Sequence, residues 1–256
     1  MDALIRRQHL PNPLPQPELH GARLNHLLAA LPDVDFDLIA RHLEPINLRL
    51  GESIYEPDRP LHHAIFPTTS IVSLHYVTAT GASAETAAVG REGMVGLALF
   101  MGGHTTASSA RVLVAGGAVR LPAGELRRAF DGVGSLRGLL LRDALSLIAQ
   151  ITLFAACNRH HPIEQQFCRW LLCALDRLQS GEMVMTHELV ANTLGVRRES
   201  ITEVAGRLQQ AGVIRYRRGH ISVLDRAGLE HRACECYAVV KGEQLRLLAS
   251  IPASHG

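Results

Sequence analysis

The chain has 256 residues, enough for the cores of two domains, and its 26 basic side chains nearly balance its 24 acidic ones. Net charge therefore points to no class of partner, so a nucleic-acid function must rest on local clusters of charge. The five cysteines are odd in number and are not spaced like a disulfide framework, which favours a reducing cytoplasm over secretion.

Residues 1–20 are predicted to form an extended arm, because prolines stand at positions 11, 13, 15 and 17. The arm lacks the apolar run of a signal peptide. The longest apolar run of the chain, residues 136–157, is interrupted by charged residues, so we expect no membrane-spanning helix. Residues 24–43 predict one or two short helices.

Residues 21–130 are predicted to form the first domain, and from Ile46 to Leu121 their pattern is that of β structure. Short apolar runs such as INLRLGESIY and HHAIFPTTSIVSLHYV alternate with glycine-containing turns. Several short strands with frequent turns are typical of a small antiparallel sandwich or barrel. Because helices are predicted on both sides of this segment, the fold class is α+β.

Residues 131–160 predict a long helix that joins two copies of the chain. One apolar stripe recurs at alternating spacings of four and three, which suits a partner helix. That predicted dimer seam consists of Leu140, Ala144, Leu147, Ile151 and Phe154. A second stripe, on another face, consists of Leu141, Leu145, Ile148 and Thr152. The helix can therefore pack on its own β domain and on a second copy at once; the alternative is a helix buried within one subunit.

Residues 161–240 predict a winged helix-turn-helix, with a tail at 241–256. Pro162 marks a break, after which PIEQQFCRWLLCALDRL predicts a helix. Thr186 is placed to cap a helix that Gly195 ends, and another helix runs from about Arg198 to Gln210. Its predicted buried stripe is Ile201, Val204, Ala205 and Leu208. VIRYRRGHISVL then predicts a β-hairpin, which completes the layout.

Charged residues gather at the start of the second helix of this unit, where the helix dipole disfavours arginine. In a winged helix-turn-helix this turn enters the DNA major groove, where arginine bonds guanine and glutamate accepts from cytosine. The predicted base-reading residues are Arg198, Glu199, Thr202 and Glu203. The predicted phosphate-binding residues are His187, Arg197, Ser200, Arg215, Arg217 and Arg218. The alternative is a solvated helix face with ordinary surface charge.

The stretch MTHELVANTLGVRRESITEVAGRLQQAGVIRYRRGHISV resembles the helix-turn-helix of the Crp/Fnr family of bacterial transcription regulators. The family's recognition helix typically begins Arg-Glu-Ser/Thr-Val/Ile, which residues 198–201 match. The resemblance extends over roughly residues 20–240 and implies a cyclic-nucleotide-binding-like jelly-roll sensor barrel before the dimerisation helix. It also implies a cytoplasmic homodimer on a two-fold symmetric DNA operator, with an unidentified effector and with RNA polymerase as a further candidate partner.

Two departures from the family pattern affect what the protein can bind. Cyclic-nucleotide binders carry Gly-Glu-x-Ala-Leu and then Pro-Arg-x-Ala, whereas this chain reads VGLALFMGGHTTASSARVLV. Because the acid and the arginine are absent, we predict no cyclic-AMP binding in the usual mode. The candidate effector pocket comprises Gly96, Leu97, Thr105, Thr106, Ser108 and Arg111. Where many members read a second guanine with arginine, this chain has Glu203, which predicts a different base preference.

The cysteines and histidines carry the remaining alternatives. No cysteine precedes Cys157, which argues against the family's N-terminal iron–sulfur cluster. Residues Cys157, Cys168 and Cys173 are predicted to be packing residues. Cys234 and Cys236 leave a redox or metal role open, but two further ligands are not evident. We therefore predict no cofactor and no metal and, because no catalytic constellation is present, no enzyme. The alternatives are an effector-sensing or protein-interaction module with an inactive DNA unit, or a metal-binding cupin-like protein that uses His62, His63, His75 and His104.

Overall fold

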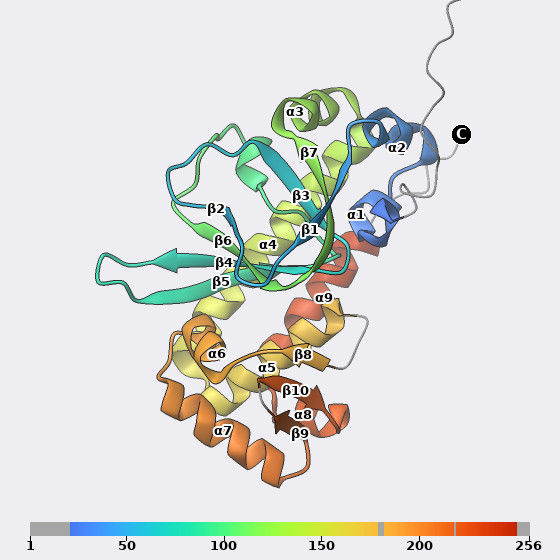
Figure 1. The fold of residues 1–256 in the computed structure, drawn as a ribbon. Helices are drawn as coiled ribbons and strands as arrows, with labels where there is room; N and C mark the ends of the chain where they lie inside the picture. Colours follow the sequence, from blue (N-terminus) through green and yellow to red (C-terminus); the bar gives the residue numbers. More distant parts are fainter. Residues whose placement is uncertain (1–20, 179–181, 218, 250–256) are drawn as a thin grey trace, which may run out of the picture.

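The computed structural model describes residues 21–178, 182–217 and 219–249. Figure 1 shows a β domain, a mostly helical C-terminal domain, and a long helix, α4, that runs along both. The predicted N-terminal arm and the end of the predicted tail lie outside the described residues.

The β domain consists of two antiparallel sheets. One sheet has the order β1 (Glu44–Leu48), β7 (Gly116–Pro122), β3 (His63–Pro67). The other has the order β2 (Ser53–Tyr55), β6 (Ser109–Val114), β4 (Ile71–Val77), β5 (Ser83–Val89). The predicted α+β class, with jelly-roll-like antiparallel sheets, is confirmed; the strands form two separate sheets and no closed barrel among the residues described.

Aliphatic side chains fill the space between the two sheets. Leu48, Ile65, Val72, Leu74 and Val112 are buried in one cluster there. Short helices cover the outer side of the β1–β7–β3 sheet and add a second cluster. These helices are η2 (Ala22–Leu24), α1 (His26–Ala29), α2 (Asp33–Ala40), η3 (Leu97–Leu99) and α3 (Ala123–Gly132). The short helices predicted for residues 24–43 are thus present.

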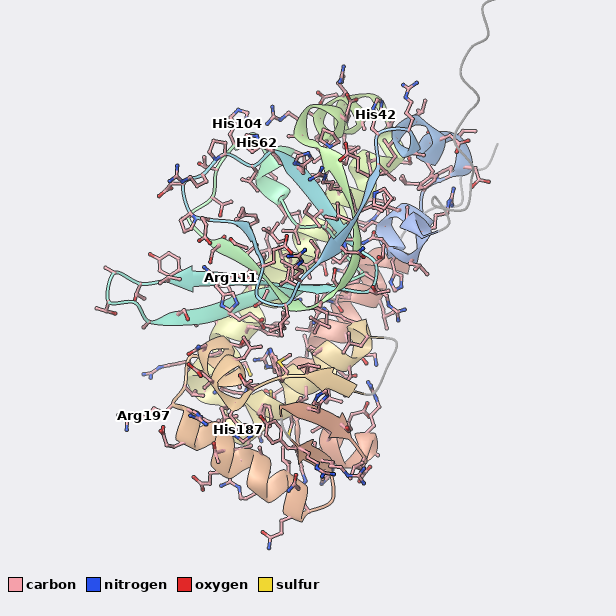
Figure 2. All side chains as sticks on the ribbon, viewed as in Figure 1. His42, His62, His104, Arg111, His187 and Arg197 are labelled. Carbon is pink, nitrogen blue, oxygen red and sulfur yellow. The ribbon has the colours of Figure 1, made fainter. Side chains whose placement is uncertain are left out.

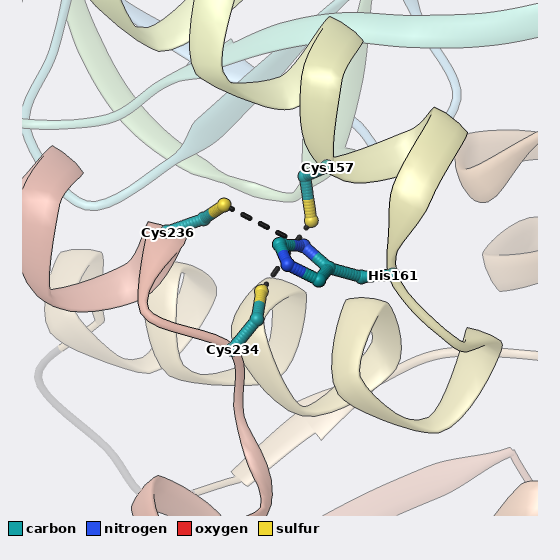
Figure 3. Close-up of side chains that lie close together, drawn as sticks. All are labelled: Cys157, His161, Cys234 and Cys236. Carbon is teal, nitrogen blue, oxygen red and sulfur yellow. Dashed lines mark hydrogen bonds between the residues drawn. The ribbon is translucent and has the colours of Figure 1, made fainter.

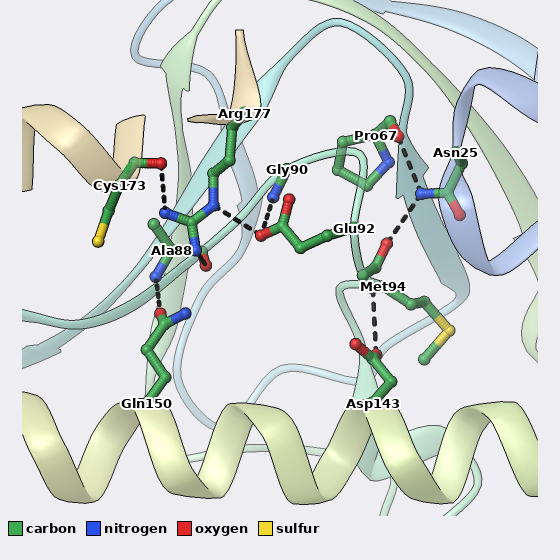
Figure 4. Close-up of polar contacts among 11 residues, drawn as sticks. Asn25, Pro67, Ala88, Gly90, Glu92, Met94, Asp143, Gln150, Cys173 and Arg177 are labelled. Atoms are coloured by element: carbon green, nitrogen blue, oxygen red, sulfur yellow. Dashed lines mark hydrogen bonds and ion pairs between the residues drawn. The ribbon is translucent and has the colours of Figure 1, made fainter. Parts of the chain in front are cut away.

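Helix α4 (Gly134–His160) is held to the β domain by polar side chains in its middle. The Asp143 carboxylate accepts a hydrogen bond from the Met94 backbone N–H at 3.2 Å, and the Gln150 side chain accepts one from Ala88 at 2.9 Å (Figure 4). By length and composition alone α4 is apolar enough to cross a membrane. Its contacts with both domains instead give it a place within the protein fold.

Three of the five residues of the predicted dimer seam on α4 are buried within the subunit, whereas Leu147 is partly buried and Ile151 is 38% exposed. Leu140, Ala144 and Phe154 are at most 4% exposed because they pack inside the subunit. The second predicted stripe faces outward: Leu141, Leu145 and Ile148 are 50–51% exposed. Apolar residues cover most of the circumference of α4, so their periodicity alone could not tell which face the subunit itself would bury.

The C-terminal domain is built around the buried helix α5 (Ile163–Arg177). Its other elements are β8 (Glu182–Val184), α6 (His187–Leu194), α7 (Arg198–Gln210), β9 (Ile214–Arg217), β10 (His220–Val223), α8 (Arg226–Arg232) and α9 (Cys236–Ala249). The strands form one sheet with the order β8–β10–β9. The predicted helices and the hairpin are confirmed. Pro162 ends α4 because it holds His161 in the extended region (φ −95°, ψ 148°).

A buried arginine joins the two domains. The Arg177 guanidinium, on α5, pairs with the Glu92 carboxylate at 2.6 Å and donates to the Ala88 carbonyl at 3.0 Å and to the Cys173 carbonyl at 3.0 Å (Figure 4). Its side chain is 5% exposed. Glu92 also accepts from the Gly90 backbone N–H at 3.1 Å, so the charge pair is hydrogen-bonded on both sides.

Candidate DNA interface

Local sequence signals form the turn between α6 and α7. The Thr186 hydroxyl accepts a hydrogen bond from the Leu189 N–H at 3.1 Å and so caps α6. Gly195 ends the helix in the left-handed region, with φ of +67°. The Val196 N–H then bonds the Ala191 carbonyl at 3.0 Å, which closes the turn. Helix α7 begins at Arg198 and buries Ile201, Val204, Ala205 and Leu208, as predicted.

Replacing Gly195 by alanine is expected to destabilise the protein by roughly 1–2 kcal/mol, the cost of a left-handed backbone for a residue with Cβ. The added Cβ would also lie 3.3 Å from the Ala84 Cβ of β5. Gly206→Ala is the matched control: it lies inside α7 with open space around an added Cβ, and alanine favours the helix by about 1 kcal/mol. Urea unfolding measures both changes in the free energy of unfolding. If the two variants change it in the same direction, this account is wrong.

Three charged side chains at the start of α7 are exposed and unpaired. Within the described parts of the chain, Arg197, Arg198 and Glu199 have no hydrogen-bond or ion-pair partner on their side chains, and all three are exposed. Figure 2 shows Arg197 extending away from the protein at this end of the helix. Charged groups that are free of internal partners can exchange water for a ligand without breaking a protein contact. Ser200, partly buried, donates its backbone N–H to the Arg197 carbonyl.

The other two predicted base-reading residues, Thr202 and Glu203, have partners within the domain. The Thr202 hydroxyl donates to the Arg198 carbonyl at 3.1 Å. Glu203 accepts from Arg207 at 2.6 Å, and Arg207 also bonds Glu164 on α5 at 3.1 Å. The unpaired charges of α7 therefore gather in its first turn.

His187, a predicted phosphate-binding residue, links α6 to α7 and to the wing. Its Nδ1 lies 3.0 Å from the Thr202 hydroxyl, and its ring stacks on Tyr216 with 4.1 Å between centroids. Burial, and then the charge of Arg198, lower the pKa of His187. A neutral imidazole gains no charge-assisted contact with phosphate, so its contacts fit a positioning role.

The wing consists of β9, β10 and the turn between them. Arg215 and Arg217 are exposed on β9, two residues apart and therefore on one face of the strand. Tyr216, between them, points the other way and donates its hydroxyl to the Met185 carbonyl at 3.2 Å. The third predicted wing residue, Arg218, lies outside the described residues. The structure thus places two wing arginines and the first turn of α7 in one unit.

The six predicted effector-pocket residues occupy different settings. Thr106 and Ser108 bond each other, with 2.8 Å between their hydroxyls, in the loop before β6, where Thr105 is exposed. Gly96 has φ of +110° and packs near Ala64, while Leu97 begins the short helix η3. Arg111 is exposed and pairs with Glu56 at 3.1 Å, so it does not stand free to hold a phosphate. The effector pocket remains a prediction.

A cavity of about 530 Å³ in the β domain is lined by other residues, among them Tyr55, Arg59 and Arg120. The histidines that would serve a cupin-like metal site do not form a cluster among the described residues. His104, for example, lies 2.8 Å from an Arg127 nitrogen. Figure 2 shows His62 and His104 at the edge of the domain. The cupin-like alternative thus gains no support.

A helix-turn-helix with a β-hairpin wing, joined by a long helix to an antiparallel β domain, defines the class of winged-helix transcription regulators. Residues 165–232 match the family described as the Crp-like helix-turn-helix domain. The C-terminal unit is therefore a Crp-like helix-turn-helix domain, and the chain has the fold of Crp/Fnr regulators. The resemblance noted in the sequence is confirmed.

Solved structures with the same fold have low sequence identity to this chain. FixK2 from Bradyrhizobium japonicum has a TM-score of 0.63 and 15% identity, over 75% of this chain and 98% of that chain. A CRP-family regulator from Thermus thermophilus has a TM-score of 0.63 and 18% identity, over 73% and 96%. A CRP/FNR-family regulator from the same organism has a TM-score of 0.60 and 22% identity, over 74% of this chain and 98% of that chain. A comparison with curated proteins gave no match.

Proposed function

We propose that this chain is a homodimeric DNA-binding transcription regulator of the Crp/Fnr type. The observation that carries the proposal is the exposed group of Arg197, Arg198 and Glu199 at the start of α7, whose side chains have no partner in the described parts of the chain. In this class of fold that turn enters the major groove. Arg198 and Glu199 then read base edges, and Arg197 and the wing arginines contact phosphates. We place the protein in the cytoplasm and assign it no catalytic role.

The dimer forms through the exposed stripe of α4. Leu141, Leu145, Ile148, Thr152 and Ala155 are exposed and recur at alternating spacings of four and three. This is the seam of a two-helix coiled coil. Two copies related by a two-fold axis would present two α7 helices to half-sites about 34 Å apart on a palindromic operator.

Regulation in this proposal acts through the junction between the domains. Residues 21–130 are the sensor domain, 131–160 the dimerisation helix and 161–240 the DNA-binding domain. The Arg177–Glu92 pair and the packing of Gly195 on Ala84 lie between sensor and DNA-binding unit. An effector that favours one geometry of this junction would shift the orientation of the α7 helices. Because the family's nucleotide cassette is absent, we propose an effector other than cyclic AMP bound in the usual mode.

The test compares two arginines of different role. Arg198→Ala is expected to lower affinity for the selected operator by roughly 5- to 150-fold, or about 1–3 kcal/mol, and to relax preference at one base pair per half-site. The operator is first selected from random duplexes with the purified protein. Fluorescence anisotropy at several salt concentrations then measures affinity for this duplex and for random DNA.

Arg217→Ala is the matched control on the wing. It is expected to weaken selected and random DNA alike and to reduce the slope of log K against log salt by about one unit. If both variants lose equal affinity on both kinds of DNA, the assignment of roles is wrong. If the wild-type protein binds no duplex at low salt, the alternative of an inactive DNA unit is correct.

A further inference from the structure

Four side chains of metal-binding type meet where the end of α4 touches the segment between α8 and α9 (Figure 3). The ligand atoms of Cys157, His161, Cys234 and Cys236 all lie within 4.8 Å of one another. The sulfurs of Cys157 and Cys234 are 3.4 Å apart, and the Cys236 sulfur is 3.7 Å from His161 Nδ1. A tetrahedral zinc ion with Zn–S bonds of about 2.3 Å places its sulfurs roughly 3.8 Å apart, close to this arrangement.

The local backbone aims each pair of ligands at the same point. Cys157 and His161 are four residues apart at the end of α4, so they lie on one face of its last turn. The His161 N–H donates a hydrogen bond to the Cys157 carbonyl at 3.0 Å. His161 thus keeps the last helical hydrogen bond of α4, although its own backbone is extended before Pro162. Cys234 and Cys236 stand at the turn between α8 and α9. Two short motifs, Cys-x3-His and Cys-x-Cys, therefore supply two ligands each.

The second ring nitrogen of His161 has the partner that a metal-bound histidine usually has. Nε2 lies 3.2 Å from the Glu235 carboxylate. A carboxylate at this position fixes the tautomer with the proton on Nε2 and leaves Nδ1, the atom that faces the cysteines, as the ligand atom.

The three sulfurs lie in an environment that is closed to solvent. Cys157, Cys234 and Cys236 are at most 6% exposed and form a cluster of their own. The remaining cysteines, Cys168 and Cys173, lie instead in the apolar core of the C-terminal domain.

A buried positive charge beside the cluster lacks a full set of partners. Arg169 is 1% exposed, and its Nε and Nη1 have no hydrogen-bond partner among the described residues. Burial raises the pKa of Glu85, a carboxyl on which the charge of Arg169 acts, to about 7. Burying a cation without a full counter-charge costs free energy. A divalent ion bound by three thiolates has a net negative charge, which would offset the positive charge of Arg169.

We propose that Cys157, His161, Cys234 and Cys236 form a Cys3His site for one zinc ion per chain. All four positions of a tetrahedral ion are filled by protein, which is the pattern of a structural rather than a catalytic zinc site. Binding would release the remaining thiol protons and fasten the start of α9 to the end of the dimerisation helix. The inference stands whether or not the protein binds DNA.

Zinc fits this donor set better than the alternatives. Soft thiolates with one imidazole in tetrahedral geometry select zinc or an iron–sulfur centre. A multinuclear cluster would hold its ligands farther apart than a single ion does, whereas these four already converge on one point. A Cys157–Cys234 disulfide would leave Cys236 and His161 without a role.

The first measurement uses the full-length protein purified under reducing conditions without added metal. Elemental analysis is expected to find close to one zinc per chain and no stoichiometric iron. After removal of zinc by a chelator, cobalt(II) is expected to restore the site and to give the visible bands of tetrahedral coordination with sulfur-to-cobalt charge transfer. Failure to take up either ion, an octahedral cobalt spectrum or an iron–sulfur chromophore would each overturn the proposal.

Variants then assign the ligands. Cys157→Ser and Cys234→Ser are expected to lose the zinc, whereas Cys173→Ser, a buried cysteine outside the cluster, is expected to keep it. His161→Ala should lose the tetrahedral cobalt spectrum, and His161→Cys should restore it with stronger charge-transfer absorption. Zinc retained in Cys157→Ser and Cys234→Ser would place the ion elsewhere and refute the assignment.

A measurement on the wild-type chain remains decisive if a variant fails to fold. Titration with a mercurial thiol reagent, followed with a zinc-sensitive dye, is expected to release the zinc as the cluster thiols react. Peptide mapping at partial release should find the reagent on Cys157, Cys234 and Cys236. Release without modification of these three cysteines, or a Cys157–Cys234 disulfide in the freshly purified protein, would contradict the proposal.

Discussion

Replacing Ile148 by aspartate is expected to convert the proposed dimer into monomers and to weaken operator binding by roughly 10²- to 10⁴-fold. Ile148 is 51% exposed at the centre of the outward stripe of α4, between Leu145 and Thr152. In the dimer its side chain would pack against the same stripe of the partner, where two carboxylates would be buried face to face. A monomer engages one half-site and loses the gain from the linked second contact, which accounts for the size of the loss.

Light scattering coupled to size-exclusion chromatography measures the first effect, and anisotropy with the selected operator measures the second. Val34→Asp is the matched control, because Val34 is a 73% exposed aliphatic residue on α2 and is not part of the outward stripe of α4. The control should remain dimeric and keep full affinity. A dimeric Ile148→Asp protein would move the interface to another surface of the chain.

The helix-turn-helix could be predicted from the sequence because its signals are local. The Thr186 cap, the left-handed Gly195 and the buried stripe of α7 each depend on residues within a few positions of one another. The same holds for the end of α4, which Pro162 sets through the conformation of its neighbour. Such features follow from short stretches of chain and need no knowledge of the tertiary fold.

The dimer seam and the cysteine cluster could not be derived in this way. Which stripe of α4 faces the subunit depends on where the β domain and α9 pack against it, and both stripes are apolar. The two pairs of candidate zinc ligands are far apart in sequence, because Cys234 comes 77 positions after Cys157. Cys234 and Cys236 looked incomplete as a metal site because Cys157 and His161 reach them only through the tertiary fold.

Helix α7 shows both what can be predicted from the sequence and what depends on the tertiary fold. The sequence predicts that Arg198 and Glu199 contact bases, and among the described residues neither side chain has a hydrogen-bond or ion-pair partner. Glu203 was predicted to read a base as well, but it is held by Arg207, which in turn reaches Glu164 on another helix. The Glu203–Arg207 pair could be predicted from its helical spacing, whereas the Arg207–Glu164 pair depends on how α5 crosses α7.

Replacing Arg177 by alanine is expected to lower the free energy of unfolding by about 3–5 kcal/mol, because one partner of a buried ion pair is removed. Among the described residues, the loss leaves the Glu92 carboxylate, 17% exposed, with only the Gly90 N–H as a hydrogen-bond donor. It also leaves the Ala88 and Cys173 carbonyls without the guanidinium. For a chain of this size the melting temperature should fall by roughly 10 °C. Arg120→Ala is the control: its pair with Glu44 is 40–51% exposed, so its loss should cost no more than about 1 kcal/mol.

A double-mutant cycle with Glu92→Gln separates the pair from the other contacts of Arg177. If the pair dominates, Arg177→Ala should cost much less in the Glu92→Gln background than in the wild-type chain, because no unpaired carboxylate then remains. Because Arg177 lies on α5 of the DNA-binding unit and Glu92 in the β domain, this coupling also measures how firmly the two domains are held together. Additive losses would mean that the carbonyl contacts, and not the charge pair, join the domains.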